Sequence, residues 1–397
     1  MTVAPAPAAA VEPAPIDQAG ELRSARIESL RAVAALGVLV GHAFIIALAY
    51  RGTSTGLRNQ LISGGLLTVF LFFTLSGYLL YWPFARRDFG GGGRIDLTRY
   101  ARNRALRILP LYYAVVAVLL ALDPLGAHRA DWWRYALFIE DYSARTVERL
   151  DSPMWSLGVE MQFYILLPLI AAGIARLARG SLARAMAIVV ALGAASFALR
   201  LERVLIGPSP VLSPLDGPFA LPTLLYFFCT GMLVALLRQA VRDREGERLP
   251  RALEWSDPWL LAAVGLWALA AAHPSWEPLI AAASFLAVGT CVLAPRRGVL
   301  LRILDWRGLA AVGVASYSLY LWHVPLLLAL SGTEIRFSDT RPPVDLTAPQ
   351  SFAGLLALAL PVCLAAALLS YRLIEAPFLR LRRGWVGPRS SSRYRER

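Results

Sequence analysis

The sequence has no lysine, only three cysteines and little charge. Charged residues make up 17% of its 397 residues, hydrophobic residues make up 57%, and the mean hydropathy is +0.53. Its long apolar stretches are too many for one soluble core, so a membrane protein is expected. The cysteines (Cys229, Cys291 and Cys363) lie singly in apolar segments without CxxC or metal-ligand spacing, and we expect no metal site.

All 40 basic residues are arginine, and the formal net charge is +13. An excess of this kind can indicate a nucleic-acid partner, but these arginines lie in short segments between apolar stretches and not on one face. Their placement predicts orientation in a membrane, with lipids and no nucleic acid as partners. The abundance of arginine, alanine, glycine and proline is typical of a GC-rich genome and favours a bacterial origin.

Ten apolar stretches are candidates for membrane-spanning helices, which need about 20 mostly apolar residues. They cover residues 32–50, 61–82, 108–122, 153–175, 183–199, 219–237, 258–272, 278–294, 309–331 and 352–374, of which the third, seventh and eighth are short. We therefore predict an all-α integral membrane protein, a multi-pass bundle of about ten transmembrane helices in the plasma (inner) membrane.

The arginines also predict the orientation of this bundle, because short cytoplasmic loops retain positive charge. If the N-terminus is inside, 30 of the 40 arginines fall in the inner segments, and the alternation holds at every loop. Both termini are therefore expected to be cytoplasmic.

The two ends of the chain differ in composition from the part between them. Residues 1–25 are rich in proline and alanine and have no apolar run, so we expect a disordered leader and not a signal peptide. Residues 381–397 are basic and serine-rich, and we expect a disordered tail. Residues 26–380 remain as one transmembrane domain.

Polar groups at bilayer depth are costly and often mark a functional site. His42 follows Arg31 by 11 residues, or almost three helical turns, so the two side chains share one helix face. Arg31 is expected at the inner mouth and His42 about 16 Å deeper. An arginine at a helix end can simply extend to water, and a lone histidine can be a packing residue. The shared face favours function, with a fixed cation near water and a titratable imidazole at mid-depth.

Two further spans carry polar residues. The segment MWSLGVEMQFY places Glu160 about two turns below the outer surface, and VASYSLYLWHVP places His323 at a similar depth, with Tyr317 and Tyr320 on adjacent turns. The alternatives are an interfacial aromatic belt for Tyr320 and a structural ion pair for Glu160 and His323.

A second group lies at the inner face. In RYARNRALRILP, Arg104 and Arg107 share a helix face and could clamp a phosphate, although topology alone explains many such arginines. The last span ends in SYRLIEAPF, which contains Glu375. In FFTLSGYLL, the Ser76–Gly77 pair predicts close helix packing and not a catalytic serine, since no base is nearby in sequence.

In their order along the chain, these motifs resemble the acyltransferase 3 family of membrane-bound O-acyltransferases, which modify polysaccharides, glycolipids and macrolides. The resemblance covers about residues 26–380 and rests on the Arg31–His42 stripe, FFTLSGYLL, RNRALRILPLYY, WSLGVEMQFY, SYSLYLWHVP and SYRLIEAP. The usual opening of the family reads Ile-Asp-Gly-Leu-Arg-Gly, and this chain differs from it at Glu28, Ser29 and Ala32.

The resemblance implies transfer of an acyl group, acetyl or another short acyl, from cytoplasmic acyl-CoA to a hydroxyl of a sugar-containing acceptor. It implies His42 and Glu160 as catalytic residues, with His42 as general base. It also implies substrate-binding roles for the remaining polar residues named above: Arg31, Arg104, Arg107, Tyr317, Tyr320, His323 and Glu375. Acyl-CoA would be a cosubstrate, with no cofactor permanently bound, and nothing indicates an oligomeric state.

Two other functions compete with this interpretation. A transporter or flippase for a lipid-linked or hydrophobic product would also place polar residues at the bilayer midplane, although no inverted repeat of the Arg31–His42 stripe occurs. A non-catalytic subunit of a membrane assembly would not need either the histidine or the glutamate.

Overall fold

The computed structural model describes residues 25–49, 56–123, 129–143, 145–206, 219–243, 255–273, 276–293, 298–332 and 351–382. The predicted leader (1–25) and tail (381–397) lie almost wholly outside these ranges. The described segments are helical, and their elements in chain order are α2 (Ala25–Ala49), α3 (Leu57–Ser63), η1 (Gly64–Thr68), α4 (Val69–Phe89), α5 (Leu97–Leu122), η2 (Arg129–Asp131), α6 (Trp132–Ala136), η3 (Glu140–Tyr142), α7 (Met154–Ala178), α8 (Leu182–Ile206), α9 (Leu221–Arg242), α11 (Asp257–Ala272), α12 (Pro278–Leu293), α13 (Val299–Leu304), α14 (Arg307–Val314), α15 (Ser316–Leu330), α16 (Phe352–Ser370), η5 (Tyr371–Glu375) and α17 (Ala376–Leu381).

Within these ranges, seven helices are long and apolar enough to cross a membrane. Helices α14 and α15 form an eighth candidate, bent by 70°, and α11 and α12 are shorter apolar helices. The predicted all-α membrane fold is confirmed, and each predicted apolar stretch overlaps a helix or the bent pair. The number ten and the cytoplasmic location of both ends remain predictions.

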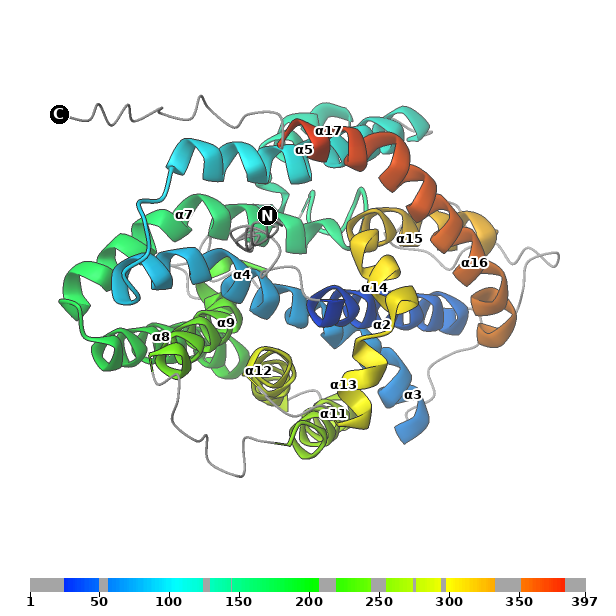
Figure 1. Cartoon of the computed structure of the whole chain (residues 1–397). Helices are drawn as coiled ribbons and strands as arrows, with labels where there is room; N and C mark the ends of the chain where they lie inside the picture. The colour runs from blue at the N-terminus through cyan, green and yellow to red at the C-terminus, as the bar shows by residue number, and fades with distance from the viewer. Residues whose placement is uncertain are drawn as a thin grey trace, which may run out of the picture.

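Helix α2 lies in the middle of the bundle (Figure 1). Helices α5 and α17 lie along one edge, and α11 and α12 lie along the opposite edge. The first span thus packs against the ninth and tenth predicted spans, and a buried cluster joins Ala35 and Leu39 of α2 to Leu319 of α15 and Cys363 of α16. This arrangement brings the first predicted span together with the last two.

Helices α4 and α9 touch at their backbones. A Cβ added to Gly77 would lie 2.1 Å from the carbonyl oxygen of Phe228, and one added to Gly231 would lie 1.9 Å from that of Thr74. Small residues permit this approach, which stabilises helix pairs where the surrounding solvent is apolar. The close packing predicted at Gly77 is confirmed.

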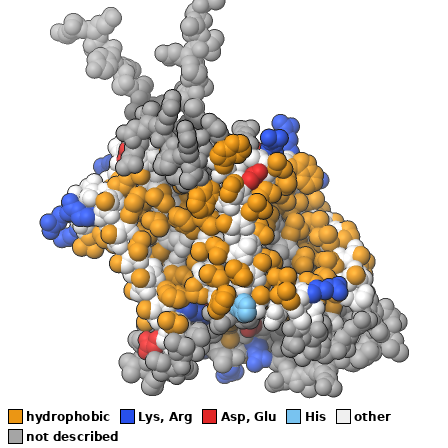
Figure 2. Space-filling view, turned by 90° about the horizontal axis from the view of Figure 1, so that it is seen from below, with side chains coloured by type: hydrophobic (Ala, Val, Ile, Leu, Met, Phe, Trp, Pro, Cys, Tyr) orange, Lys and Arg blue, Asp and Glu red, His pale blue; other side chains and the backbone are white. Residues whose placement is uncertain are grey.

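Hydrophobic side chains also cover the outside of the bundle. Figure 2 shows one face on which they predominate, with the basic side chains toward its margins. On α7, Ile165, Leu169 and Leu177 are 65–70% exposed, although leucine and isoleucine are normally buried in a soluble protein. Exposed apolar side chains in this number fit a surface that faces lipid.

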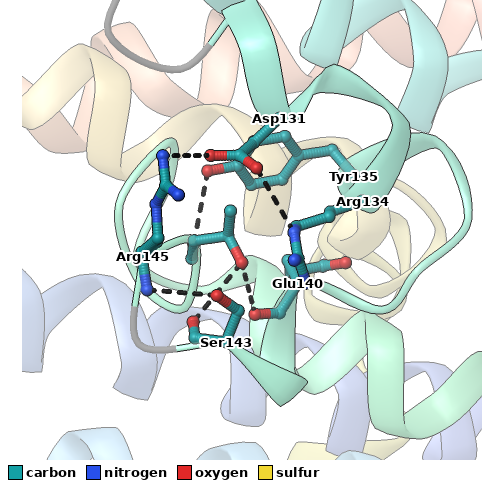
Figure 3. Close-up of polar contacts among 7 residues, drawn as sticks. Asp131, Arg134, Tyr135, Glu140, Ser143 and Arg145 are labelled. Atoms are coloured by element: carbon teal, nitrogen blue, oxygen red, sulfur yellow. Dashed lines mark hydrogen bonds and ion pairs between the residues drawn. The ribbon is translucent and has the colours of Figure 1, made fainter.

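The connection between α5 and α7 has its own polar network (Figure 3). Asp131 pairs with Arg134 at 3.3 Å and with Arg145 at 3.8 Å. The hydroxyl of Thr146 donates to the carbonyl of Glu140 at 2.8 Å, and the Glu140 side chain is 1% exposed. Because this burial disfavours the charged carboxylate, the pKa of Glu140 is raised from 4.5 to about 8.

Candidate functional site

A pocket lies between α2, α4, α5, α7 and α15, and its empty space, open solvent at its mouth included, is about 730 Å³. Six of the nine residues singled out from the sequence line it: Arg31, Arg104, Arg107, Glu160, Tyr317 and Tyr320. Phe72, Phe73, Leu75, Leu79, Leu80, Ile108 and Leu157 supply the apolar part of its wall. An apolar pocket with a few convergent polar groups is the usual form of a small-molecule site.

Three arginines and one glutamate face this pocket. Nε of Arg31 donates to the hydroxyl of Ser316 at 3.2 Å and lies 3.7 Å from the carboxylate of Glu28. Nε of Arg104 is buried and has no hydrogen-bond partner among the described residues. Buried polar groups normally have a hydrogen-bond partner, so a bound ligand could supply the partner that this nitrogen lacks. The arginine excess favours an anionic or strongly polarised ligand.

Glu375 lies behind the pocket and does not line it. It is 2% exposed and sits at the end of the π-helical turn η5. Its carboxylate accepts from the hydroxyl of Ser318 at 2.5 Å and lies 3.7 Å from a terminal guanidinium nitrogen of Arg107. The hydroxyl of Tyr317 on α15 donates to the carbonyl of Ile108 on α5 at 2.9 Å, so these two helices are also joined directly. Glu375 therefore holds Arg107 in place.

Glu160 has a partner that its sequence motif does not predict. Its carboxylate accepts a hydrogen bond from the hydroxyl of Ser76, which also lies 3.2 Å from the hydroxyl of Tyr164. Ser76 and Glu160 are 84 residues apart and belong to α4 and α7. The FFTLSGYLL motif contains Ser76 but predicts only the close packing at Gly77. In the structure, Gly77 faces α9 and Ser76 faces α7.

His42 and His323 are in direct contact. Nδ1 of His42 lies 3.1 Å from Nε2 of His323, and the ring centroids are 5.0 Å apart at 62°. Nδ1 of His42 also lies 3.0 Å from the carbonyl of Val38, and Nδ1 of His323 lies 2.6 Å from the carbonyl of Tyr320. Arg31 and His42 thus both contact α15, as expected from their shared face.

These contacts assign the tautomers, since a carbonyl oxygen can only accept. Nδ1 carries the proton in both neutral rings. Nε2 of His323 is then an acceptor for Nδ1–H of His42, which is shared with Val38. Nε2 of His42 is left unprotonated, and it has no hydrogen-bond partner among the described residues. His323 is 1% exposed, whereas His42 is half-buried. Of the two histidines, His42 therefore has the free nitrogen lone pair, on Nε2.

The two histidines lie beside the pocket and do not line it. Tyr320 connects the two places, because it lines the pocket and its ring centroid is 5.6 Å from that of His323. Its hydroxyl lies 2.6 Å from the hydroxyl of Ser156 and donates to the carbonyl of Pro153 at 3.1 Å. The structure describes no contact between His42 and Glu160. In the described ranges, no group of three or more histidine, cysteine, aspartate or glutamate side chains could hold a metal ion.

Together, the fold and the pocket define an all-α membrane protein with a pocket lined by three arginines. Residues 24–368 match the model of the acyltransferase 3 family, described as an acyltransferase domain, and the chain therefore belongs to this family. This finding confirms the resemblance that the motifs suggested.

Curated relatives match part of the chain. It is similar to O-acetyltransferase OatA of Staphylococcus aureus (strain NCTC 8325 / PS 47), with 27% identity over 160 residues, which is 36% of this chain and 24% of that protein. It is also similar to a putative O-acetyltransferase of S. aureus (strain COL), with 28% identity over 166 residues and the same two shares. The match thus spans about a quarter of the length of each relative. No solved structure matches the chain.

Proposed function

We propose that this protein is an O-acyltransferase that moves an acetyl or other short acyl group from acyl-CoA to a hydroxyl of a sugar-containing acceptor. The observation that carries the proposal is the free Nε2 of His42, which is unprotonated because Nδ1 donates to Val38 and His323. Family membership and the names of the two O-acetyltransferases support the reaction class. In a bacterium, such a multi-pass chain would lie in the plasma membrane.

His42 would act as the general base. Its Nε2 takes the proton of the acceptor hydroxyl while the hydroxyl oxygen attacks the thioester carbon. The carbon–sulfur bond then breaks, the coenzyme A sulfur takes the proton from Nε2, and coenzyme A leaves as the free thiol. His42 is neutral again at the end, so atoms and charge balance. During the attack the imidazolium keeps its Nδ1 proton and donates hydrogen bonds through it to Nε2 of His323 and to the carbonyl of Val38.

The pocket would receive the acyl end of the donor. Negative charge develops on the thioester oxygen during attack, and guanidinium groups that are already in place stabilise it without reorganisation. Arg31 is fixed by Ser316, Arg107 is fixed by Glu375, and Arg104 retains a buried donor for the ligand. Glu160, hydrogen-bonded to Ser76, limits the positive charge of the pocket. The acyl group must extend past Tyr320 to meet the acceptor hydroxyl at His42.

The test compares whole cells that lack the gene with cells that express the wild type or one of two variants. Mass spectrometry of metabolites and surface glycans should show an added acyl mass only when the protein is active. We expect His42→Ala to abolish the added mass. The matched control is His273→Ala, since His273 lies at the end of α11 and its ring contacts Trp276. Immunoblots of the membrane fraction establish equal insertion. Acylation by His42→Ala at the wild-type level would reject the proposal, and export of a product without acyl-CoA would support a transporter.

A further inference from the structure

Three guanidinium groups surround one buried tryptophan near the C-terminal ends of α4 and α9. The Trp82 side chain is 1% exposed. Cζ of Arg238 lies 4.5 Å from the centroid of its ring, and those of Arg86 and Arg242 each lie 5.9 Å from it. These four residues, here named the Trp82 cluster, play no part in the function proposed above.

Arg238 is held at two points and does not simply extend toward water. Its guanidinium stacks on Trp82 and donates to the hydroxyl of Tyr78 at 2.5 Å. The two helices that carry the cluster touch at Gly77 and Gly231, so their relative position is fixed. An arginine that merely orients a membrane protein needs neither contact. The cluster is therefore built before any ligand arrives.

The neighbouring carboxylates are engaged elsewhere. Asp88 pairs with Arg87 at 2.5 Å, and Asp243 accepts from the side-chain amide of Gln239 at 2.7 Å. Among the described residues, no carboxylate lies within ion-pairing distance of Arg86 or Arg238. The like charges of Arg86 and Arg238 lie beside one ring and repel each other, and an anion bound near them would reduce this repulsion.

We propose that the Trp82 cluster binds a phosphate group. Planar guanidinium groups with forked donors match phosphate oxygens, and several of them converge here from two helices. Phosphate reaches a membrane protein from two sources, a soluble ligand and an anionic phospholipid. Leu79 lines the pocket, and Arg86 follows it by seven residues, about two turns, on the same face of α4. A phosphate of coenzyme A is thus one candidate, which rests on the proposed function, and a lipid headgroup is the other.

The experiment measures binding to the full-length protein in two kinds of nanodisc. In phosphatidylcholine discs, calorimetry gives the affinities of coenzyme A and 3′-dephospho-coenzyme A. In discs that contain phosphatidylglycerol, native mass spectrometry measures how much anionic lipid the released protein retains. The variants are Arg238→Gln and the double variant Arg86→Gln/Arg242→Gln, so that the test stands if one of them does not fold. Arg184→Gln is the control, because Arg184 is exposed on α8.

We expect about tenfold weaker binding of one ligand class per lost guanidinium and no change in the control. Weaker binding of coenzyme A, with unchanged binding of the dephospho compound, would assign the site to the 3′-phosphate. Equal weakening of both would assign it to the diphosphate, and loss of retained phosphatidylglycerol would assign it to lipid. Wild-type binding of all three by both variants would overturn the proposal. Binding is measured without turnover, so the result of the acylation test with His42→Ala does not change the result of this one.

Discussion

Replacement of His323 by leucine tests the arrangement around His42 most directly. In the wild type, Nδ1–H of His42 faces two acceptors, Val38 at 3.0 Å and His323 at 3.1 Å, and leucine removes the second. A hydrogen bond from a charged group contributes about 1.5–3 kcal/mol, which corresponds to a factor of about 10–150 in rate. Because the Val38 carbonyl remains, we expect the lower end of this range, a fall in kcat of about tenfold to thirtyfold.

The assay is the initial rate of coenzyme A release, measured with the acceptor that the mass comparison identifies. The KM for acyl-CoA should stay unchanged, because His323 does not line the pocket. His323→Gln retains an oxygen that can accept from His42, and its kcat should stay within about threefold of the wild type. A wild-type kcat for His323→Leu would refute the reasoning. Equal losses in the leucine and glutamine variants would show that His323 acts only by packing.

Two further predictions concern stability, followed as thermal unfolding in detergent. Glu140 binds its proton up to a pH of about 8 in the native state but only up to about 4.5 when unfolded, so the wild type should lose stability as pH rises between these values, by at most about 1.4 kcal/mol per pH unit. Glu140→Gln should lose less between pH 5 and pH 8, and parallel pH curves for the two proteins would contradict the raised pKa. Gly77→Ala would place a Cβ 2.1 Å from the Phe228 carbonyl and should destabilise by about 1–3 kcal/mol, whereas Gly173→Ala meets no atom within 4 Å and should be neutral or stabilising. Equal melting temperatures for the two alanine variants would show that α4 and α9 separate easily.

The sequence predicts the helices well because a membrane span must be long and apolar, and each predicted stretch overlaps a helix or the bent pair. It also predicts which residues share a face, since the helical period alone relates Arg31 to His42. The 70° bend before α15 was not predicted, because residues 309–331 read as one continuous apolar stretch. Alanine and glycine before Ser316 gave no sign of it.

The sequence alone does not predict which helices contact each other. The pairs His42–His323 and Ser76–Glu160 are separated by 281 and 84 residues. Periodicity states which side of a helix is polar, but not which other helix that side faces. The prediction of a substrate-binding role for His323 is untested, and its observed contact with His42 points to positioning instead. The roles of the other predicted site residues also stay predictions.

The pairing of Arg107 with Glu375 has a consequence for how the protein is made. Arg107 directly precedes the third predicted span, and the carboxylate that lies 3.7 Å from it directly follows the last one. Until that span is synthesised, Arg107 lacks this carboxylate, and in the complete bundle its side chain is only 13% exposed. The nascent chain must therefore carry an incomplete site through most of its insertion. The contact between Arg107 and Glu375 forms only after residue 375 has been synthesised, so a chain that stops earlier lacks it.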